Sequence, residues 1–469
     1  MSATSAHILV QAPASKSMSH RALIGAALAP GESRLSGVLE SQDTAHTMAA
    51  LTACGAGFAR LKGGEYLVQG MRHGPVSGSG VADLDVGESG TTCRLLAGVV
   101  TAGRGRLRIH GAPRMHERPL GEPARALESQ GVRFVWEQKS GYPPVTIETT
   151  GLPGGEVDVR LEESSQYLSG ILLAAPLAAR AMTIAVSGAK AVSWPYVSLT
   201  LQTMRDFGVP VVVETLQNGQ FKAVEHESVT RAEPGKLRFI IAPGQYQARS
   251  LCVEGDWSNA SYFLAAGAVG QHPVTVRGLT RDSLQGDRAI LDILAGMGAR
   301  IAWTSGSHSK EGGKEGGDEV TVTAPASGQL RGTLRGIDVD MGACPDLVPT
   351  VAVAACFAQG QTVIRNVAHL RIKECDRLET LAVEIAKTGC LAAMTGDTLT
   401  ITPAPLPAGK RILFESRGDH RMVMGPALFA LGGIDAQFDN PGCVAKSFPE
   451  FWERFEAVLA GAAKAQEPA

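Results

Sequence analysis

The sequence predicts an α/β protein of two domains, an inside-out α/β barrel assembled from six copies of a βαβαββ unit. Two observations support this fold. One local pattern returns along the 469-residue chain: an apolar position is followed four residues later by a glycine, and then by an alternating apolar strand. A second helix, apolar on most of its faces, lies between successive copies. Such helices are usually buried, so we expect helices inside and sheets outside.

The recurring glycines mark helix ends. A glycine just past the end of a helix is the usual left-handed stop, and each is expected to begin a β-hairpin. Their spacing of roughly 75 to 90 residues indicates repeated supersecondary units. The five positions are Gly55, Gly131, Gly208, Gly298 and Gly389.

The apolar helices alternate with these segments, and each is followed by a short strand. The helices are expected over 21–28, 92–100, 167–179, 260–269, 347–357 and 422–431. The strands are expected over 34–37, 107–111, 182–184, 274–278, 362–366 and 434–437.

The last copy of the unit sets the expected domain boundaries. It ends in a helix over 449–459 with no hairpin after it, and we expect the run 8–10 to supply its missing strand. One domain then comprises 15–253, and the other comprises 1–14 plus 254–469. The Gly-, Ser-, Lys- and Glu-rich stretch 305–318 is expected to form a flexible surface insertion in the fourth hairpin.

Composition excludes several classes of function. The formal net charge is −2, so no bulk field attracts nucleic acid or anionic lipid. The eight cysteines are scattered and form no CxxC pair, which argues against a zinc site or a disulfide framework. We see no signal peptide and no apolar stretch long enough to span a bilayer. We therefore expect a cytoplasmic protein with no metal, nucleic-acid or membrane partner.

The stretch from Ser15 to Arg21 lies where a strand meets an apolar helix. A helix N-terminus presents free N–H groups and partial positive charge, so it favours anions. Lys16, Ser17 and Arg21 would add donors to one oxyanion. The alternative is a serine cap followed by two solvated cations, and this segment alone leaves both interpretations open.

Other polar residues stand at or between the starts of the apolar helices. Singly, each has an ordinary structural interpretation: a helix cap or turn, a surface ion pair or, for Glu374, a salt bridge on a helix face. Together they predict a cluster of cations that binds two anionic groups, with a carboxylate placed to act as acid or base. The main members are Gly90, Thr91, Ser164, Ser165, Gln166, Arg118, Asp346, Glu374, Arg377, Arg421 and Lys446.

These motifs, taken in order, resemble the enolpyruvyl transferase family, and within it the branch that acts on shikimate 3-phosphate. The resemblance extends from Ile8 to about Leu459. Its most specific motifs are Lys16-Ser17-x-Ser19-x-Arg21, Arg114-Met115-x-Glu117-Arg118-Pro119, Ser164-Ser165-Gln166, Lys373-Glu374-x-Asp376-Arg377-Leu378, Asp419-His420-Arg421-Met422 and Lys446-Ser447-Phe448-Pro449.

The resemblance implies a reaction and a site. The enolpyruvyl group of phosphoenolpyruvate passes to the 5-hydroxyl of shikimate 3-phosphate through a tetrahedral intermediate, and phosphate is released. This step belongs to chorismate and aromatic amino acid biosynthesis. It implies no cofactor and a cytoplasmic monomer, with the site in a cleft between the domains. The implied catalytic residues are Asp346 as base, Glu374 as proton donor, and Lys16.

The resemblance also assigns substrate contacts. Those to shikimate 3-phosphate are Lys16, Ser17, Arg21, Ser164, Ser165, Gln166, Ser193, Tyr196, Asp346, His369 and Lys373. Those to phosphoenolpyruvate are Lys16, Gly90, Arg118, Gln166, Arg377, Arg421 and Lys446.

Three positions depart from the usual family pattern. Glu88 and His369 stand where Asn is common, and Trp194 replaces a common Lys. We further expect Gly90 to leave room for glyphosate to compete with phosphoenolpyruvate. Two alternatives remain: an enolpyruvyl transferase acting on UDP-N-acetylglucosamine, whose family typically carries a catalytic cysteine in the second domain, and a non-catalytic anion-binding relative.

Overall fold

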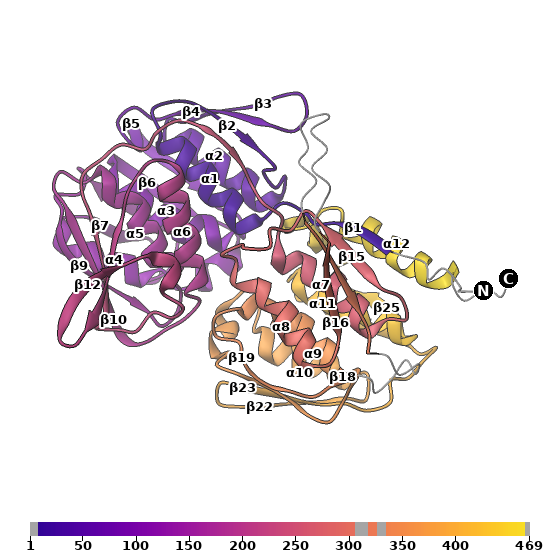
Figure 1. Cartoon of the computed structure of the whole chain (residues 1–469). Helices are drawn as coiled ribbons and strands as arrows, with labels where there is room; N and C mark the ends of the chain where they lie inside the picture. The colour runs from indigo at the N-terminus through magenta and orange to yellow at the C-terminus, as the bar shows by residue number, and fades with distance from the viewer. Residues whose placement is uncertain (1–7, 305–317, 326–333, 465–469) are drawn as a thin grey trace. The chain divides into compact units, whose positions relative to one another are not determined.

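The computed structural model describes residues 8–304, 318–325 and 334–464. The insertion expected at 305–318 therefore lies, except for Asp318, outside the described residues. The fold is mixed α/β (Figure 1). The chain divides into two compact units. The amino-terminal unit is Ala14–Val253, and the carboxyl-terminal unit is Met1–Pro13 with Glu254–Ala469.

The amino-terminal unit has a helical core surrounded by three sheets (Figure 1). Its helices are α1 (Lys16–Leu28), α2 (Gln42–Ala53), α3 (Gly90–Val99), α4 (Gly121–Leu127), α5 (Gln166–Ala174) and α6 (Pro195–Asp206). Its strands are β2 (Gly31–Ser36), β3 (Gly57–Arg60), β4 (Tyr66–Gly70), β5 (Val76–Asp85), β6 (Arg104–His110), β7 (Arg133–Trp136), β8 (Val145–Thr149), β9 (Gly155–Leu161), β10 (Met182–Ala191), β11 (Val212–Gln217), β12 (Gln220–Val224), β13 (Leu237–Ile241) and β14 (Ser250–Cys252).

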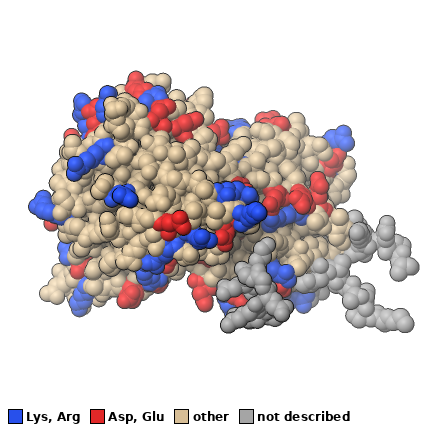
Figure 2. Space-filling model, turned by 90° about the horizontal axis from the view of Figure 1, so that it is seen from above, with Lys and Arg blue, Asp and Glu red and all other residues tan. Residues whose placement is uncertain are grey.

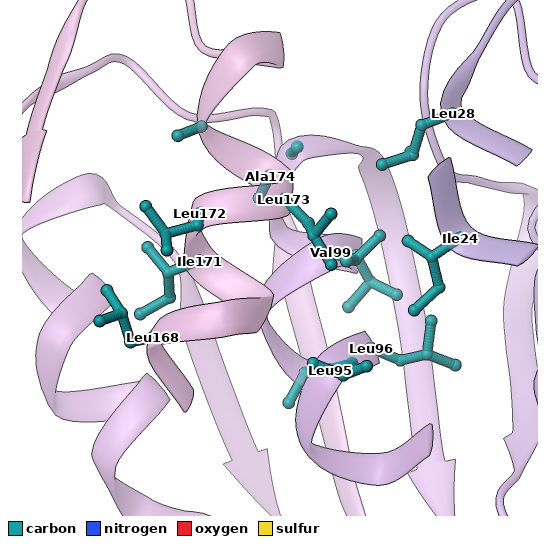
Figure 3. Close-up of a cluster of buried hydrophobic side chains, with 14 of the residues drawn as sticks. Ile24, Leu28, Leu95, Leu96, Val99, Leu168, Ile171, Leu172, Leu173 and Ala174 are labelled. Carbon is teal, nitrogen blue, oxygen red and sulfur yellow. The ribbon is translucent and has the colours of Figure 1, made fainter. Parts of the chain in front are cut away.

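Helices α1, α3 and α5 supply apolar side chains that meet inside this unit (Figure 3). Two glycines bring α3 and α5 into close contact. A Cβ atom added to Gly170 would lie 2.6 Å from the carbonyl oxygen of Leu95, and one added to Gly98 would lie 2.3 Å from the carbonyl carbon of Gly170. Helix packing this close leaves no space for water, so these three helices form the interior as the sequence predicts.

Leu172 on α5 offers a direct test of this core, because its side chain is fully buried (Figure 3). Leu172→Ala is expected to lower the free energy of unfolding by about 2–5 kcal/mol, since it removes apolar contacts and leaves a cavity. The measurement is urea unfolding followed by circular dichroism. Leu216→Ala, at an exposed position in the same unit, is the control, and an equal loss in both variants would contradict the packing described here.

The carboxyl-terminal unit has its own apolar core, and its described strands form two four-stranded and two two-stranded sheets. Its helices are α7 (Trp257–Val269), α8 (Ile290–Gly296), α9 (Val348–Ala355), α10 (Arg377–Ala386), α11 (Arg421–Ala427) and α12 (Phe451–Lys464). Its strands are β1 (Ile8–Gln11), β15 (Val274–Arg277), β16 (Arg300–Thr304), β17 (Glu319–Thr323), β18 (Leu334–Arg335), β19 (Asp338–Asp340), β20 (Ala358–Gln359), β21 (Thr362–Arg365), β22 (Leu391–Thr395), β23 (Thr398–Thr402), β24 (Arg411–Phe414) and β25 (Asp435–Phe438).

Four of the sheets share one strand order. In each of them a parallel pair of strands is followed by an antiparallel hairpin. These sheets are β5-β6-β8-β7, β14-β2-β4-β3, β19-β21-β23-β22 and β1-β15-β17-β16. The sheet β12-β11-β13-β10-β9 carries an extra edge strand. The five glycines predicted to end helices all have positive φ, and the strands of the hairpin pair after each of them. The predicted helix stops and hairpins are therefore confirmed.

The expected place of the N-terminal strand is wrong. β1 does not complete the sheet of the last copy; it pairs in parallel with β15, with Ile8 opposite Val274. Ile8 and Val10 are buried there and fill the free edge of that sheet, while β24 and β25 remain a two-stranded parallel sheet. The last helix, α12, still packs on β1, where Arg454 donates to the carbonyl of Gln11. The sequence pattern predicts that the first strand and the last helix belong to the same unit, but it does not show which strand β1 pairs with.

Three further observations concern the cysteines, the surface charge and the length of the helices. All eight cysteines are free thiols. On the face shown in Figure 2, basic and acidic side chains are intermingled, as expected from the near-zero net charge. Among the described residues, no helix is both long and apolar enough to cross a lipid bilayer.

Candidate functional site

The start of α1 carries the first predicted cations. Ser15 caps the helix by accepting a hydrogen bond from the backbone N–H of Met18 (3.5 Å), so this part of the alternative interpretation is confirmed. The cations, however, are not freely solvated. The ammonium group of Lys16 lies 3.3 Å from a carboxylate oxygen of Asp43, and its side chain is only 13% exposed.

Arg21 is fully buried and joins three helices. Its Nε donates to Thr200 Oγ1 and its Nη2 donates to the carbonyl of Tyr196, both at 2.8 Å, and Nη2 also lies 3.5 Å from Ser169 Oγ. A further bond reaches the carbonyl of Ser17 (2.8 Å). Burial lowers the pKa of Arg21 to about 10, so it stays charged at neutral pH. These bonds fix α1 against α5 and α6; its contact with shikimate 3-phosphate stays a prediction.

Gly90 opens α3 directly against Arg118. A Cβ atom at Gly90 would lie 2.2 Å from Arg118 Nη2 and 2.4 Å from its Cζ. Arg118 is buried and donates to the backbone carbonyl of Glu88 (3.2 Å). Glu88, which departs from the usual family pattern, therefore contacts Arg118 through its backbone carbonyl. The alternative interpretation of Arg118 as a surface ion pair is wrong, because this guanidinium lies in the interior beside the start of α3.

The start of α5 faces the start of α3. Gln166 Nε2 donates to Thr91 Oγ1 at 3.0 Å, and Gln166 Oε1 accepts from Arg94 at 3.4 Å. The backbone N–H of Gln166 donates to Ser164 Oγ (3.2 Å), so the serine also acts as a local cap. Because arginine can only donate, these partners fix the amide orientation of Gln166. Ser165 is buried beside them.

Ser193 precedes α6 in an uncommon backbone conformation, with a φ of 56°. Non-glycine residues in this region are strained and cluster at functional sites. Its carbonyl accepts from the backbone N–H of Tyr196 (3.2 Å). Trp194 turns inward, where its indole N–H donates to the carbonyl of Val229 (2.6 Å).

In the carboxyl-terminal unit, Arg377 is the centre of an ion-pair network. It is the first residue of α10, and its side chain is 2% exposed. Its guanidinium contacts Asp346 (3.0 Å), Glu374 (2.8 Å) and Asp419 (2.8 Å). Burial alone would lower the pKa of Arg377, but these three carboxylates raise it well above its ordinary value. Glu374 does pair with Arg377, but it lies in the bend before α10, so the alternative interpretation as a salt bridge on a helix face is wrong.

A second buried arginine shares Asp346. Arg421, at the start of α11, donates to Asp346 Oδ2 at 2.9 Å and to its backbone carbonyl at 3.2 Å. It also lies 3.1 Å from the hydroxyl of Tyr262. Burial opposes the charge of Arg421, but Asp346 raises its pKa overall. Asp346 is thus bound by two fixed guanidinium groups and is not a helix cap: α9 has no side-chain cap bond.

Two lysines complete this group. Lys446 lies 3.8 Å from Glu374, and Lys373 lies 4.0 Å from Asp346. A nearby acid, Asp287, is buried, and burial together with the charge of Asp346 raises its pKa to about 7. His369 is buried in the 3-10 helix Ala368–Ile372, just before Lys373. Its proposed contact with a substrate phosphate stays a prediction.

Each unit thus brings its own predicted residues together: the starts of α1, α3, α5 and α6 in one, and of α9, α10 and α11 in the other. Sequence reasoning missed three partners, Asp43, Tyr262 and Asp419. Asp419 stands in the motif before Arg421, which was a usable signal. Asp43 and Tyr262 lie within ordinary helices, and no local pattern distinguishes them.

Comparisons with known proteins match this chain over nearly its whole length. A family model described as EPSP synthase (3-phosphoshikimate 1-carboxyvinyltransferase) matches residues 5–455. A 3-phosphoshikimate 1-carboxyvinyltransferase of Shewanella amazonensis is 38% identical over 447 residues, covering 95% of each chain. That of Nitrosomonas europaea is 38% identical over 450 residues, covering 96% of this chain and 95% of the relative.

A solved EPSP synthase structure from Acinetobacter baumannii matches with a TM-score of 0.73 at 25% identity. The match covers 97% of this chain and 96% of that one. The sequence and structural matches both extend over nearly the entire chain. The chain therefore belongs to the EPSP synthase (3-phosphoshikimate 1-carboxyvinyltransferase) family.

Proposed function

We propose that this protein transfers the enolpyruvyl group of phosphoenolpyruvate to the 5-hydroxyl of shikimate 3-phosphate and releases phosphate. The observation that carries the proposal is the buried network of Arg377, Asp346 and Glu374, in which an acid and a base share one fixed cation. Family membership supports the same reaction.

Binding is the first requirement. The two substrates bring two phosphates and two carboxylates together, and their mutual repulsion must be offset by cations. We propose that Arg377, Arg421 and Lys446 hold phosphoenolpyruvate, because arginine forks match the geometry of carboxylates and phosphates. The predicted phosphoenolpyruvate contacts of the amino-terminal unit are Lys16, Gly90, Arg118 and Gln166.

Shikimate 3-phosphate needs a phosphate site and donors for its hydroxyls. Proposed contacts from the amino-terminal unit are Lys16, Ser17, Arg21, Ser164, Ser165, Gln166, Ser193 and Tyr196, and those from the carboxyl-terminal unit are Asp346, His369 and Lys373. The helix starts of α1 and α5 add backbone N–H groups, which favour anions.

The chemistry requires two proton transfers. Asp346 takes the proton of the 5-hydroxyl as its oxygen bonds to C2 of phosphoenolpyruvate, and Glu374 protonates the methylene carbon C3. The tetrahedral intermediate then loses phosphate from C2 and a proton from C3, which restores the double bond. Phosphate leaves with its bridging oxygen, and the cations already in place stabilise its charge without rearrangement. No cofactor is needed, because every step is a proton transfer, an addition at C2 or an elimination of phosphate from C2.

We also propose that each unit is an inside-out barrel of three βαβαββ copies. Four sheets with one strand order and the fully buried helix α7 support this interpretation. In that arrangement the helices of a unit begin near one another, which accounts for the clustering of the site residues. We further propose that the protein acts as a monomer in the cytoplasm, as the family resemblance implies.

The test is phosphate release, measured with a coupled assay. Purified protein is supplied with phosphoenolpyruvate together with shikimate 3-phosphate, with UDP-N-acetylglucosamine, or with no acceptor. Phosphate release is expected only in the mixture that contains both phosphoenolpyruvate and shikimate 3-phosphate. Release with the UDP-sugar would favour the related transferase, and no release with either acceptor would favour a non-catalytic relative.

The contact of Gly90 with Arg118 predicts the effect of adding one methyl group. In Gly90→Ala the new Cβ displaces Arg118, so the KM for phosphoenolpyruvate is expected to rise about tenfold. Glyphosate carries a phosphonate and a carboxylate and competes for the same cations, so its inhibition constant is expected to rise further. Steady-state kinetics with Gly244→Ala as control checks this, since a Cβ there meets only ordinary contacts. Equal inhibition of wild type and Gly90→Ala would contradict it.

A further inference from the structure

We propose that Asp43 is a positioning residue, which holds the ammonium group of Lys16 in place and ties it to the start of α3. The inference deepens the proposed function and rests on it, because Lys16 is a proposed catalytic residue. Asp43 itself is not among the residues that the family resemblance assigned.

The first support is the ion pair itself. Asp43 Oδ2 lies 3.3 Å from Lys16 Nζ, and the side chains are 4% and 13% exposed. Asp43 is the second residue of α2, whose start is fixed by a reciprocal capping box between Ser41 and Thr44. The carboxylate is therefore presented from a rigid helix start, as a preorganised site requires.

The second support is the backbone of the same residue. The carbonyl of Asp43 accepts from the hydroxyls of Thr47 and Thr92, both at 3.3 Å. Thr92 lies on α3 two residues after Gly90, and its hydroxyl also lies 2.7 Å from that of Ser89, the cap of α3. One residue on α2 thus touches both anion-binding helix starts, α1 through its side chain and α3 through its carbonyl.

The third support is the charge of the neighbours. His20 Nδ1 lies 2.7 Å from Thr47 Oγ1, and burial lowers the pKa of His20 to about 3. This imidazole is therefore neutral at neutral pH, and Arg21 beside it is cationic. Asp43 supplies a negative charge to the buried cluster of Lys16, His20 and Arg21. A lysine has a long flexible stem, so a fixed carboxylate reduces the freedom lost when the ammonium group must meet a substrate.

Asp43→Ala is expected to act on turnover more than on binding. Without the carboxylate, Lys16 is no longer held for the transition state, so kcat is expected to fall by about 10- to 100-fold. The same change removes a negative charge beside an anion site, which offsets the loss in ground-state binding. The affinity for shikimate 3-phosphate, measured by titration calorimetry, is therefore expected to change by less than about threefold.

Two further variants complete the experiment. Asp43→Glu, which keeps the charge, is expected to recover most of kcat, and Asp83→Asn is the control, because Asp83 forms an exposed ion pair with Arg108 in the same unit. The inference is overturned if kcat of Asp43→Ala stays within about threefold of wild type. It is also overturned if Asp43→Glu recovers nothing, or if affinity and melting temperature fall in parallel with kcat. Absence of turnover in the wild type would instead overturn the proposed function, so the two failures are distinguishable.

Discussion

Asp346→Asn is expected to lower kcat by about 100- to 10,000-fold, the usual contribution of a general base. The amide keeps the size of the side chain but cannot accept the proton of the acceptor hydroxyl. Arg377 retains its contacts with Glu374 and Asp419, so the network is expected to persist. Turnover is measured by phosphate release with both substrates saturating.

Asp338→Asn is the matched control for this variant. Asp338 lies in the same unit and pairs with Arg365 at the surface, where both side chains are more than half exposed. Its turnover is expected to equal that of wild type. If Asp346→Asn retained turnover within about twofold of wild type, Asp346 would not be the base.

Arg377→Met is expected to have the largest effect on stability. Methionine fills much of the space but leaves Asp346, Glu374 and Asp419 without the guanidinium that they share. Asp419 is 0% exposed, so its charge has no access to water. Breaking a buried ion pair by removing one partner costs about 3–5 kcal/mol, and turnover is expected to be lost together with stability.

The measurement is the midpoint of urea unfolding, followed by fluorescence. Arg365→Met removes an exposed partner of Asp338 and is expected to cost less than about 1 kcal/mol. Similar midpoints for the two arginine variants would show that the Arg377 network contributes no more than a surface pair.

The helices and hairpins could be predicted because their signals are local. A few neighbouring residues are enough to predict a buried helix from the apolar run of α5, or a helix end from Gly131. The strand partner of β1 could not be predicted in this way, because Ile8 pairs with a residue more than 250 positions away.

The residues of the candidate site also differ in whether the sequence could predict them. The arginines and acids of the motifs could be found because charged residues stood at or between the starts of the apolar helices, and their expected roles came from the family resemblance. The residues that pair with these side chains could not be found in the same way. Asp419 was visible only as a neighbour of Arg421, and Asp43 looks like an ordinary residue in the first turn of a helix. The pairing of Lys16 with Asp43 depends on how α1 and α2 pack, which composition and spacing do not contain.

The most direct test follows the bridging oxygen of phosphoenolpyruvate. The substrate is labelled with ¹⁸O between C2 and phosphorus, incubated with the protein and shikimate 3-phosphate, and the released phosphate is analysed by ³¹P NMR. Enolpyruvyl transfer breaks the C–O bond, so the account predicts that the phosphate carries the label. Unlabelled phosphate, with the label left in pyruvate, would mean hydrolysis at phosphorus and would contradict the account.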